Sequence, residues 1–226
     1  MLLEIPGVLS ADAVAHCRSK LATADWQDGR HSAGYLSQSV KANAQLADND
    51  RTAAELGEVI LDALDRSALF ASAALPLKLV PPLFNRYAAG QTYGSHIDGA
   101  IRPITGTPYK VRTDLSATLF LSDPDDYDGG ELVIEDTQGE RRIRLAAGDM
   151  VLYPGTSVHR VSPVTRGVRL AAFFWIQSMV RDLQQRTLLF RLDNAVQEIA
   201  SELPDHKSVV ELAGIYHNLL RRWADT

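Results

Sequence analysis

The chain has 226 residues, of which 46% are hydrophobic and 23% charged, and its formal net charge at pH 7 is −5. This length suits one large domain, or one domain with a helical appendage. The acidic balance lacks the basic signature of nucleic-acid binders and the apolar runs are too short to span a bilayer, so we expect neither nucleic acid nor a membrane as partner. The single Cys17 cannot form an internal disulfide, which favours a reducing compartment and predicts a cytoplasmic location.

The N-terminal part, residues 1–76, is expected to consist of helices and loops that pack on a core. Ser10 is a suitable N-cap for a first helix. Residues 26–46 are rich in Gly, Ser, Asn and Gln, and we interpret them as a loop with a strand near residues 33–37. A second helix is expected over residues 51–72, because apolar residues recur there at helical spacing.

The central part, residues 77–178, changes to a period of two. Short apolar runs such as residues 115–121, 150–153 and 168–176 are separated by turn-forming residues. Many short strands at regular spacing are typical of an antiparallel sandwich or barrel. The sequence therefore predicts a mainly β core.

The C-terminal part, residues 179–226, returns to helical periodicity. One helix should reach about residue 202, Pro204 breaks it, and Ser208 is a suitable cap for a last helix. This helical pair suits a cover for the barrel or a contact in a homo-oligomer. The predicted fold class is thus α+β, mainly β with flanking helices.

Three side chains stand out as candidate metal ligands. His96 and Asp98 are two positions apart, so on an extended backbone they point to the same face. His159 lies in a later strand-like stretch of the same core. Two histidines and one carboxylate on one face leave further metal positions open, as in non-haem Fe(II) oxygenases. A lone His-x-Asp pair is weak by itself, and a structural role is its alternative.

Arg169 stands in the strongly apolar strand at residues 168–176. A charge buried there without a partner would be costly, so Arg169 needs an anion. A dicarboxylate cosubstrate would supply one. The alternative is an internal carboxylate such as Glu131, which would make Arg169 structural.

Taken together, several motifs make the chain resemble a known family. They are His96-Ile97-Asp98, Asp128-Gly129-Gly130-Glu131-Leu132, Gly148-Asp149-Met150-Val151-Leu152-Tyr153-Pro154, His159-Arg160-Val161 and Arg169. The region from about residue 77 to 178 resembles the Fe(II)/2-oxoglutarate-dependent dioxygenase domain of the prolyl 4-hydroxylase type. Over nearly its full length, the chain resembles the bacterial PKHD-type hydroxylases, including the helical C-terminal part.

The resemblance implies a double-stranded β-helix, or jelly-roll, core. It implies that His96, Asp98 and His159 hold Fe(II), and that Arg169 binds the distal carboxylate of 2-oxoglutarate. It implies a hydroxylase that consumes O₂, decarboxylates 2-oxoglutarate to succinate and CO₂, and uses L-ascorbate as reductant. The family is often linked to bacterial iron homeostasis and siderophore uptake. Tyr87 is a candidate hydroxyl donor to the cosubstrate, and a packing aromatic is the equal alternative.

Two other functions remain open from the sequence. One is a non-enzymatic sensor barrel that binds metal or 2-oxoglutarate, and the other is a Zn or Mn cupin-like enzyme. Arg169 argues against a pure metal sensor, which has no need of a buried carboxylate fork. We expect the loops at residues 26–46 and 101–110 to shape the acceptor pocket, but they do not reveal whether the substrate is a small molecule or a peptide.

Overall fold

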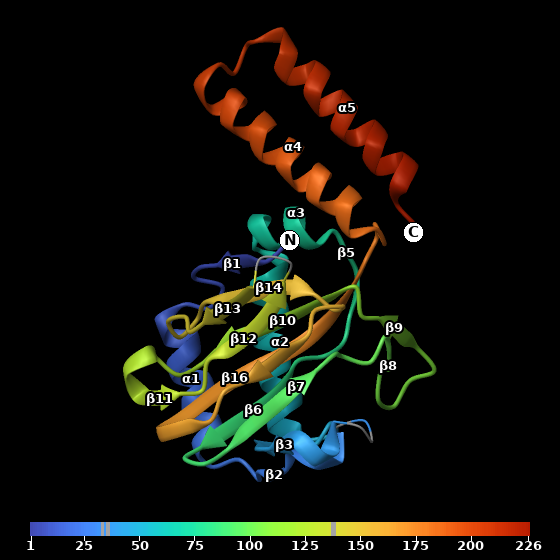
Figure 1. Cartoon of the computed structure of the whole chain (residues 1–226). Coiled ribbons are helices and arrows are strands. Elements are labelled where there is room, and N and C mark those ends of the chain that lie inside the picture. The colour runs from blue at the N-terminus through green and yellow to red at the C-terminus, as the bar shows by residue number, and fades with distance from the viewer. Residues whose placement is uncertain (33, 35–36, 137–138) are drawn as a thin grey trace.

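Two antiparallel sheets face each other and form the core of the chain (Figure 1). The computed structural model describes residues 1–32, 34, 37–136 and 139–226. The larger sheet contains β1 (Leu3–Ile5), β2 (Gln27–Asp28), β4 (Ala44–Gln45), β5 (Pro76–Leu79), β6 (Leu83–Ala88), β10 (Leu115–Phe120), β11 (Tyr127–Gly129), β14 (Met150–Pro154) and β16 (Val164–Ser178). The smaller sheet contains β3 (Lys41–Ala42), β7 (Thr92–His96), β12 (Leu132–Asp136), β13 (Gly139–Ile143) and β15 (His159–Val161). A separate ribbon pairs β8 (Ile101–Pro103) with β9 (Lys110–Arg112).

The long strand β16 organises the larger sheet. It pairs with β10 along one edge and with β6 along the other. Its side chains alternate between two environments, as a strand buried on both faces requires. Leu170, Ala172 and Phe174 pack toward the helices, whereas Arg169 and Trp175 face the space between the sheets. The predicted mainly β fold class with a jelly-roll core is therefore confirmed.

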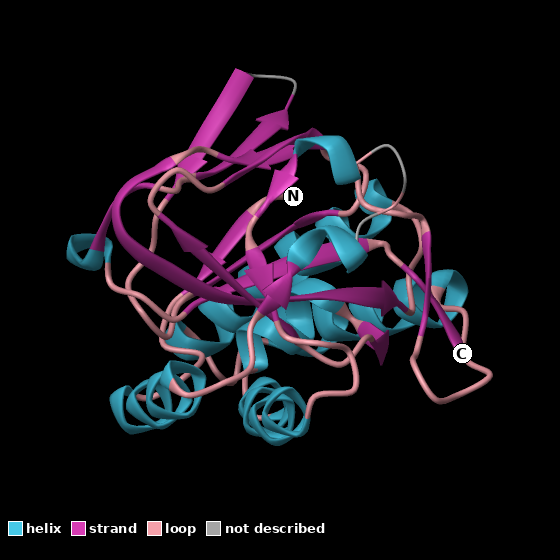
Figure 2. Ribbon diagram, turned by 90° about the horizontal axis from the view of Figure 1, so that it is seen from below, coloured by secondary structure: helices cyan, strands magenta, loops and turns pink. Residues whose placement is uncertain are grey.

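Three helices cover the outer face of the larger sheet (Figure 2). They are α1 (Ala11–Ala22), α2 (Arg51–Asp65) and α3 (Ala68–Ala74). Ser10 caps α1 as predicted, since its hydroxyl accepts the Ala13 amide at 3.3 Å. The single helix expected over residues 51–72 is wrong, because Ser67 begins a new helix by accepting the Phe70 amide at 3.2 Å. Apolar spacing continues across this break, so periodicity alone did not reveal it.

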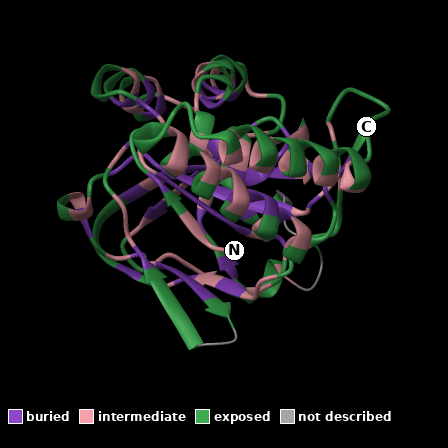
Figure 3. Ribbon diagram, turned by 90° about the horizontal axis from the view of Figure 1, so that it is seen from above, coloured by how far each residue is buried: buried purple, intermediate pink, exposed green. Residues whose placement is uncertain are grey.

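The last two helices, α4 (Leu183–Glu202) and α5 (Lys207–Trp223), form a hairpin that projects from the sheets (Figure 1). The hairpin is mostly exposed or half-buried (Figure 3), and α5 has no buried residue. The N-cap of α5 differs from the expectation. The cap is His206 and not Ser208, and its Nδ1 accepts a hydrogen bond from the Ser208 amide at 3.2 Å. None of the helices in the described ranges is both long and apolar enough to cross a bilayer.

The first 76 residues also contribute strands. Here β1 pairs with β14 in the larger sheet, and β3 pairs with β7 in the smaller one. The strand expected near residues 33–37 falls largely on positions outside the described residues. The division at residues 76 and 178 stays a prediction.

Candidate active site

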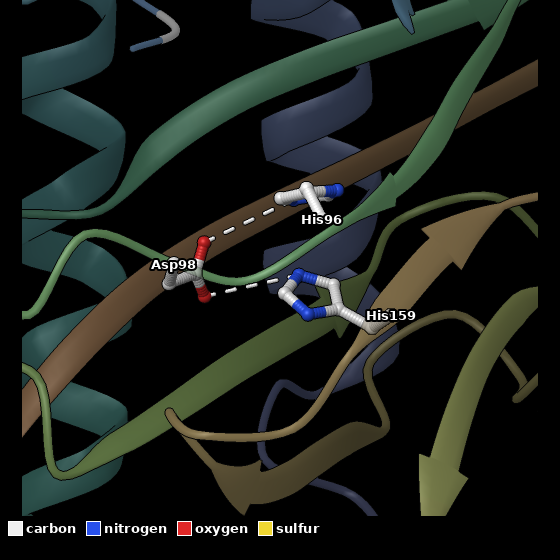
Figure 4. Close-up of side chains that lie close together, drawn as sticks. All are labelled: His96, Asp98 and His159. Atoms are coloured by element: carbon white, nitrogen blue, oxygen red, sulfur yellow. Dashed lines mark ion pairs between the residues drawn. The ribbon is translucent and has the colours of Figure 1, made fainter. Parts of the chain in front are cut away.

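The smaller sheet brings the three candidate metal ligands together. His96 at the end of β7 and His159 at the start of β15 are direct cross-strand partners, and Asp98 follows β7 by two residues. The carboxylate faces both rings from one side (Figure 4), with Oδ1 3.9 Å from His96 Nε2 and Oδ2 3.8 Å from His159 Nε2. One ligand atom from each residue lies within 4.8 Å of the others. The set could therefore hold one divalent metal ion.

Hydrogen bonds fix the orientation of each candidate ligand. His96 Nδ1 lies 2.9 Å from the Gly94 carbonyl, and His159 Nδ1 lies 3.1 Å from the Ser157 carbonyl. Each Nδ1 must donate to its carbonyl, so each Nε2 presents a lone pair toward Asp98. Burial, and next the neighbouring His159, lower the pKa of His96 to about 4, which keeps the ring neutral as a metal ligand must be.

Neighbouring side chains contact each of the three candidate ligands. The Ser116 hydroxyl donates to Asp98 Oδ2 at 2.7 Å. Tyr93 stacks on the His96 ring at 3.7 Å between centroids, and Tyr153 meets His159 edge-on at 5.2 Å. These contacts restrict both imidazoles and shield them from water. Ser116 was not identified from the sequence, because its partner is 18 positions away and only the packing of the two sheets against each other brings the two together.

Arg169 is the most unusual side chain of the larger sheet. It is 1% exposed, and its guanidinium carbon lies 5.5 Å from the Tyr87 ring centroid and 5.1 Å from that of Phe120. In the described residues, none of its three guanidinium nitrogens has a hydrogen-bond partner. The internal partner considered from the sequence does not form, since Glu131 instead accepts from Arg142 at 2.9 Å.

Gly130 makes room for the stem of this arginine. Gly130 has φ +61°, and a Cβ there would lie 2.9 Å from Val164 Cγ2 and 3.2 Å from Arg169 Cδ. A larger residue would be strained and would press on the arginine stem. The strand end therefore needs glycine to seat the guanidinium.

The candidate metal ligands and the surroundings of Arg169 line one cavity of about 290 Å³ between the sheets. The metal triad, Arg169 and Tyr87 all contribute to its wall. Lys41 and Arg102 also line the cavity. The sequence did not single out these two residues, although they lie in the loops at residues 26–46 and 101–110 that were expected to shape the acceptor pocket. The cavity thus combines three candidate metal ligands with a buried cation that has no hydrogen-bond partner among the residues the structure describes.

This architecture and site define the class of Fe(II)- and 2-oxoglutarate-dependent oxygenases, and comparison with known proteins agrees. The family model described as the 2OG-Fe(II) oxygenase superfamily matches residues 82–177, and the one described as the PKHD-type hydroxylase C-terminal domain matches residues 184–225. A PKHD-type hydroxylase from Saccharophagus degradans is 58% identical over 226 residues, covering 100% of both chains. The chain therefore belongs to the PKHD-type hydroxylases.

Solved structures support the same fold at low sequence identity. A prolyl-4-hydroxylase from Pseudomonas putida is 21% identical, with a TM-score of 0.50, and the match covers 78% of this chain and 92% of that one. HygX from Streptomyces hygroscopicus, with nickel, 2-oxoglutarate and hygromycin B bound, is 18% identical, with a TM-score of 0.51 and coverage of 79% and 84%. These matches show the fold.

Proposed function

We propose that the chain hydroxylates a C–H bond of its substrate in a reaction that uses one O₂ and one 2-oxoglutarate. One oxygen atom enters the substrate as the hydroxyl, and the other enters succinate as CO₂ is released. In this proposal His96, Asp98 and His159 hold Fe(II), and Arg169 pairs with the distal carboxylate of 2-oxoglutarate. The sensor alternative receives no support from the comparisons, which match hydroxylases and oxygenases.

The observation that carries the proposal is the unpartnered guanidinium of Arg169. A fully buried cation with no acceptor costs several kcal/mol, far more than a neutral residue in the same place. A guanidinium also matches a carboxylate in a planar, two-point contact. Arg169 shares the cavity with the metal triad, so an anion that pairs with it also lies near the metal. A dicarboxylate that is both metal ligand and ion-pair partner fits these two features.

The residues of the chain position the reactants. When bound, Fe(II) and 2-oxoglutarate supply the oxidising chemistry that O₂ alone lacks. The two histidines present fixed Nε2 lone pairs, and Ser116 holds Asp98 in place. Burial raises the pKa of Tyr87, so its hydroxyl stays protonated and able to donate to the cosubstrate. Its ring also packs against Arg169, so both roles considered from the sequence are compatible.

The proposal also covers the cofactors, the reductant, the physiological role, the location and the oligomeric state. HygX, which shares the fold, has been crystallised with nickel and 2-oxoglutarate, and this supports a divalent metal ion together with 2-oxoglutarate here. Use of ascorbate as reductant, a link to iron homeostasis or siderophore uptake, a cytoplasmic location and a homo-oligomeric state remain predictions.

The test is succinate formation by the purified protein. With Fe(II), 2-oxoglutarate and O₂, but no acceptor, we expect slow release of succinate that ascorbate accelerates. His159→Ala should reduce this rate to that of an enzyme-free Fe(II) control. Wild-type succinate formation no faster than that control would contradict the proposal.

A further inference from the structure

The cavity is long enough to have two distinct ends. Arg169, Phe173 and Trp175 are separated by even numbers of positions on β16, so their side chains share its inward face, and all three line the cavity. Six residues of extended strand span about 20 Å. One end is therefore formed around Arg169 and the other around Trp175, and the metal triad lies toward the second end, because Asp98 accepts a hydrogen bond from Ser116, the cross-strand partner of Trp175.

Arg102 marks the Trp175 end. Its guanidinium carbon lies over the Trp175 ring, 4.3 Å from the centroid. Across the described stretches of the chain, no hydrogen bond or ion pair involves its side chain. Other arginines differ, since Arg112 is held by Asp114 at 2.6 Å and Arg166 by Asp128 at 2.7 Å. Arg102 is thus a half-buried cation that is oriented by an aromatic ring and directed at the cavity.

Lys41 adds a second cation to the same part of the wall. It is 5% exposed, donates to Gln45 Oε1 at 2.9 Å, and lies 5.1 Å from the centroid of the Tyr93 ring, which stacks on His96. Burial and then repulsion from Arg102 lower the pKa of Lys41 to about 8, against the opposing effects of Asp98, Asp48 and Asp28. Lys41 therefore remains largely charged near pH 7 and lies close enough to Arg102 for their charges to interact.

The charges of the cavity do not balance when the proposed ligands are present. Among the described residues, three cations line it, Lys41, Arg102 and Arg169, against the single carboxylate of Asp98. A divalent metal and a doubly charged 2-oxoglutarate cancel each other, so the excess of two positive charges remains. Since 2-oxoglutarate occupies Arg169, this excess lies at the Trp175 end. A poorly solvated positive wall attracts an anion strongly.

The same end also offers apolar surface. Phe173 meets Trp175 edge-on at 5.5 Å, and Ile97 lines the cavity although 54% of it is exposed. We propose that Arg102 and Lys41 bind an oxyanion, such as a carboxylate, on the hydroxylated substrate, while Trp175 and Phe173 pack against its apolar part. This inference rests on the proposed function, because that function assigns the Arg169 end to 2-oxoglutarate.

A pair of probes that differ only in charge tests the inference. Protein loaded with Mn(II) in place of Fe(II) and saturated with 2-oxoglutarate is titrated with benzoate and, separately, with benzamide. Paramagnetic relaxation of the probe protons by Mn(II) reports binding near the metal without requiring turnover. We expect benzoate to bind at least about tenfold more tightly than benzamide, because a charge-assisted hydrogen bond is gained.

Variants identify the residues responsible. Arg102→Gln should weaken benzoate binding about tenfold and leave the affinities for benzamide and 2-oxoglutarate unchanged, and Lys41→Gln should act in the same direction. Arg166→Gln is the matched control, since it removes the same charge from an exposed arginine held by Asp128, and benzoate binding should not change.

Four results would overturn the inference. Equal binding of the two probes, or benzoate binding that is unchanged in Arg102→Gln, would show that this end does not select anions. Benzoate that displaces 2-oxoglutarate would place the anion at Arg169 instead. Failure of 2-oxoglutarate itself to bind, measured before any probe is added, would refute the proposed function and with it this inference.

Discussion

Two regions of the molecule bury arginine in opposite ways. Arg169 in the cavity is 1% exposed, and Arg186, where β16 joins α4, is 3% exposed. The Arg186 guanidinium donates to the carbonyls of Val180 and Arg181 at 2.6 and 2.7 Å. Arg169 has no acceptor in the described part of the chain.

The polar groups near Arg186 and those near Arg169 also differ in whether the protein supplies their hydrogen bonds. At the junction, Asp114, whose side chain is 6% exposed, accepts two hydrogen bonds from Arg112 and one from the Ser178 amide. In the cavity, both His Nε2 atoms face Asp98 at distances too long for hydrogen bonds. A buried polar group that the protein satisfies stabilises the fold, whereas one left unsatisfied is available to a ligand. Substitutions at the junction should therefore reduce stability, and substitutions in the cavity should reduce binding.

Loss of a metal ligand should have the largest effect. Asp98→Ala is expected to weaken Fe(II) binding by more than about a hundredfold, because even a supporting residue outside the ligand set contributes ten- to hundredfold. Ser116→Ala, which removes only the hydrogen bond to Asp98, should cost about tenfold. Anaerobic calorimetry with Fe(II) measures both, and unchanged affinity in Asp98→Ala would show that the carboxylate is structural.

Arg169→Lys should come next in magnitude. Lysine keeps the charge but offers a point donor in place of the planar fork, so one charge-assisted hydrogen bond is lost. The cost of roughly 1.5–3 kcal/mol corresponds to about ten- to hundredfold weaker 2-oxoglutarate binding. Fe(II) affinity should be unchanged, and the ligand-free protein should unfold at the wild-type temperature. A lower unfolding temperature with normal 2-oxoglutarate affinity would show that Arg169 stabilises the fold and does not bind the cosubstrate.

Asp114→Asn tests the junction. The amide cannot accept the two-point contact of Arg112 as the carboxylate does, which should cost roughly 1.5–3 kcal/mol of unfolding free energy. For a chain of this size, the melting temperature should fall by roughly 3–12 °C. The affinity of the folded protein for 2-oxoglutarate should match wild type. A selective loss of that affinity would contradict the claim that the junction stabilises the fold and only the cavity binds ligands.

Gly130→Ala should have the smallest effect and involve both properties. The positive φ makes alanine strained there, and its Cβ would press on Arg169 Cδ. We expect a loss of about 1–2 kcal/mol in unfolding free energy and a few-fold weaker 2-oxoglutarate binding. Gly214→Ala in α5 is the matched control, since nothing lies within 4 Å of its added Cβ, and it should be neutral or slightly stabilising.

The sequence predicted the parts of this picture that depend on local spacing. Alternation along a strand placed His96 and Asp98 on one face, and the apolar run around Arg169 marked that residue as needing an anion. The C-terminal helices followed from helical periodicity and the break at Pro204. The structure brings His96 and Asp98 together and forms the helices, because each of these features depends on residues within a few positions of one another, and the anion partner of Arg169 stays a prediction.

The sequence did not predict what depends on how distant elements pack against one another. Ser116 meets Asp98 only because β10 lies beneath the β7 end, and Arg102 reaches Trp175 only because the β8–β9 ribbon lies over the cavity. Nor could spacing decide whether Glu131 held Arg169, since that depended on the competing contact with Arg142. Which acceptor pairs with a buried charge depends on contacts between distant residues, and these exist only in the folded chain.

The most direct test of the central claim compares two ligands that differ only where Arg169 would act. 2-Oxopentanoate carries a methyl group in place of the distal carboxylate of 2-oxoglutarate. Calorimetry on the Mn(II)-loaded wild type should show 2-oxoglutarate binding at least about a hundredfold more tightly, as expected for a two-point charged contact. In Arg169→Met this preference should nearly vanish. A preference that persists in Arg169→Met would contradict the account, because another group would then bind the distal carboxylate.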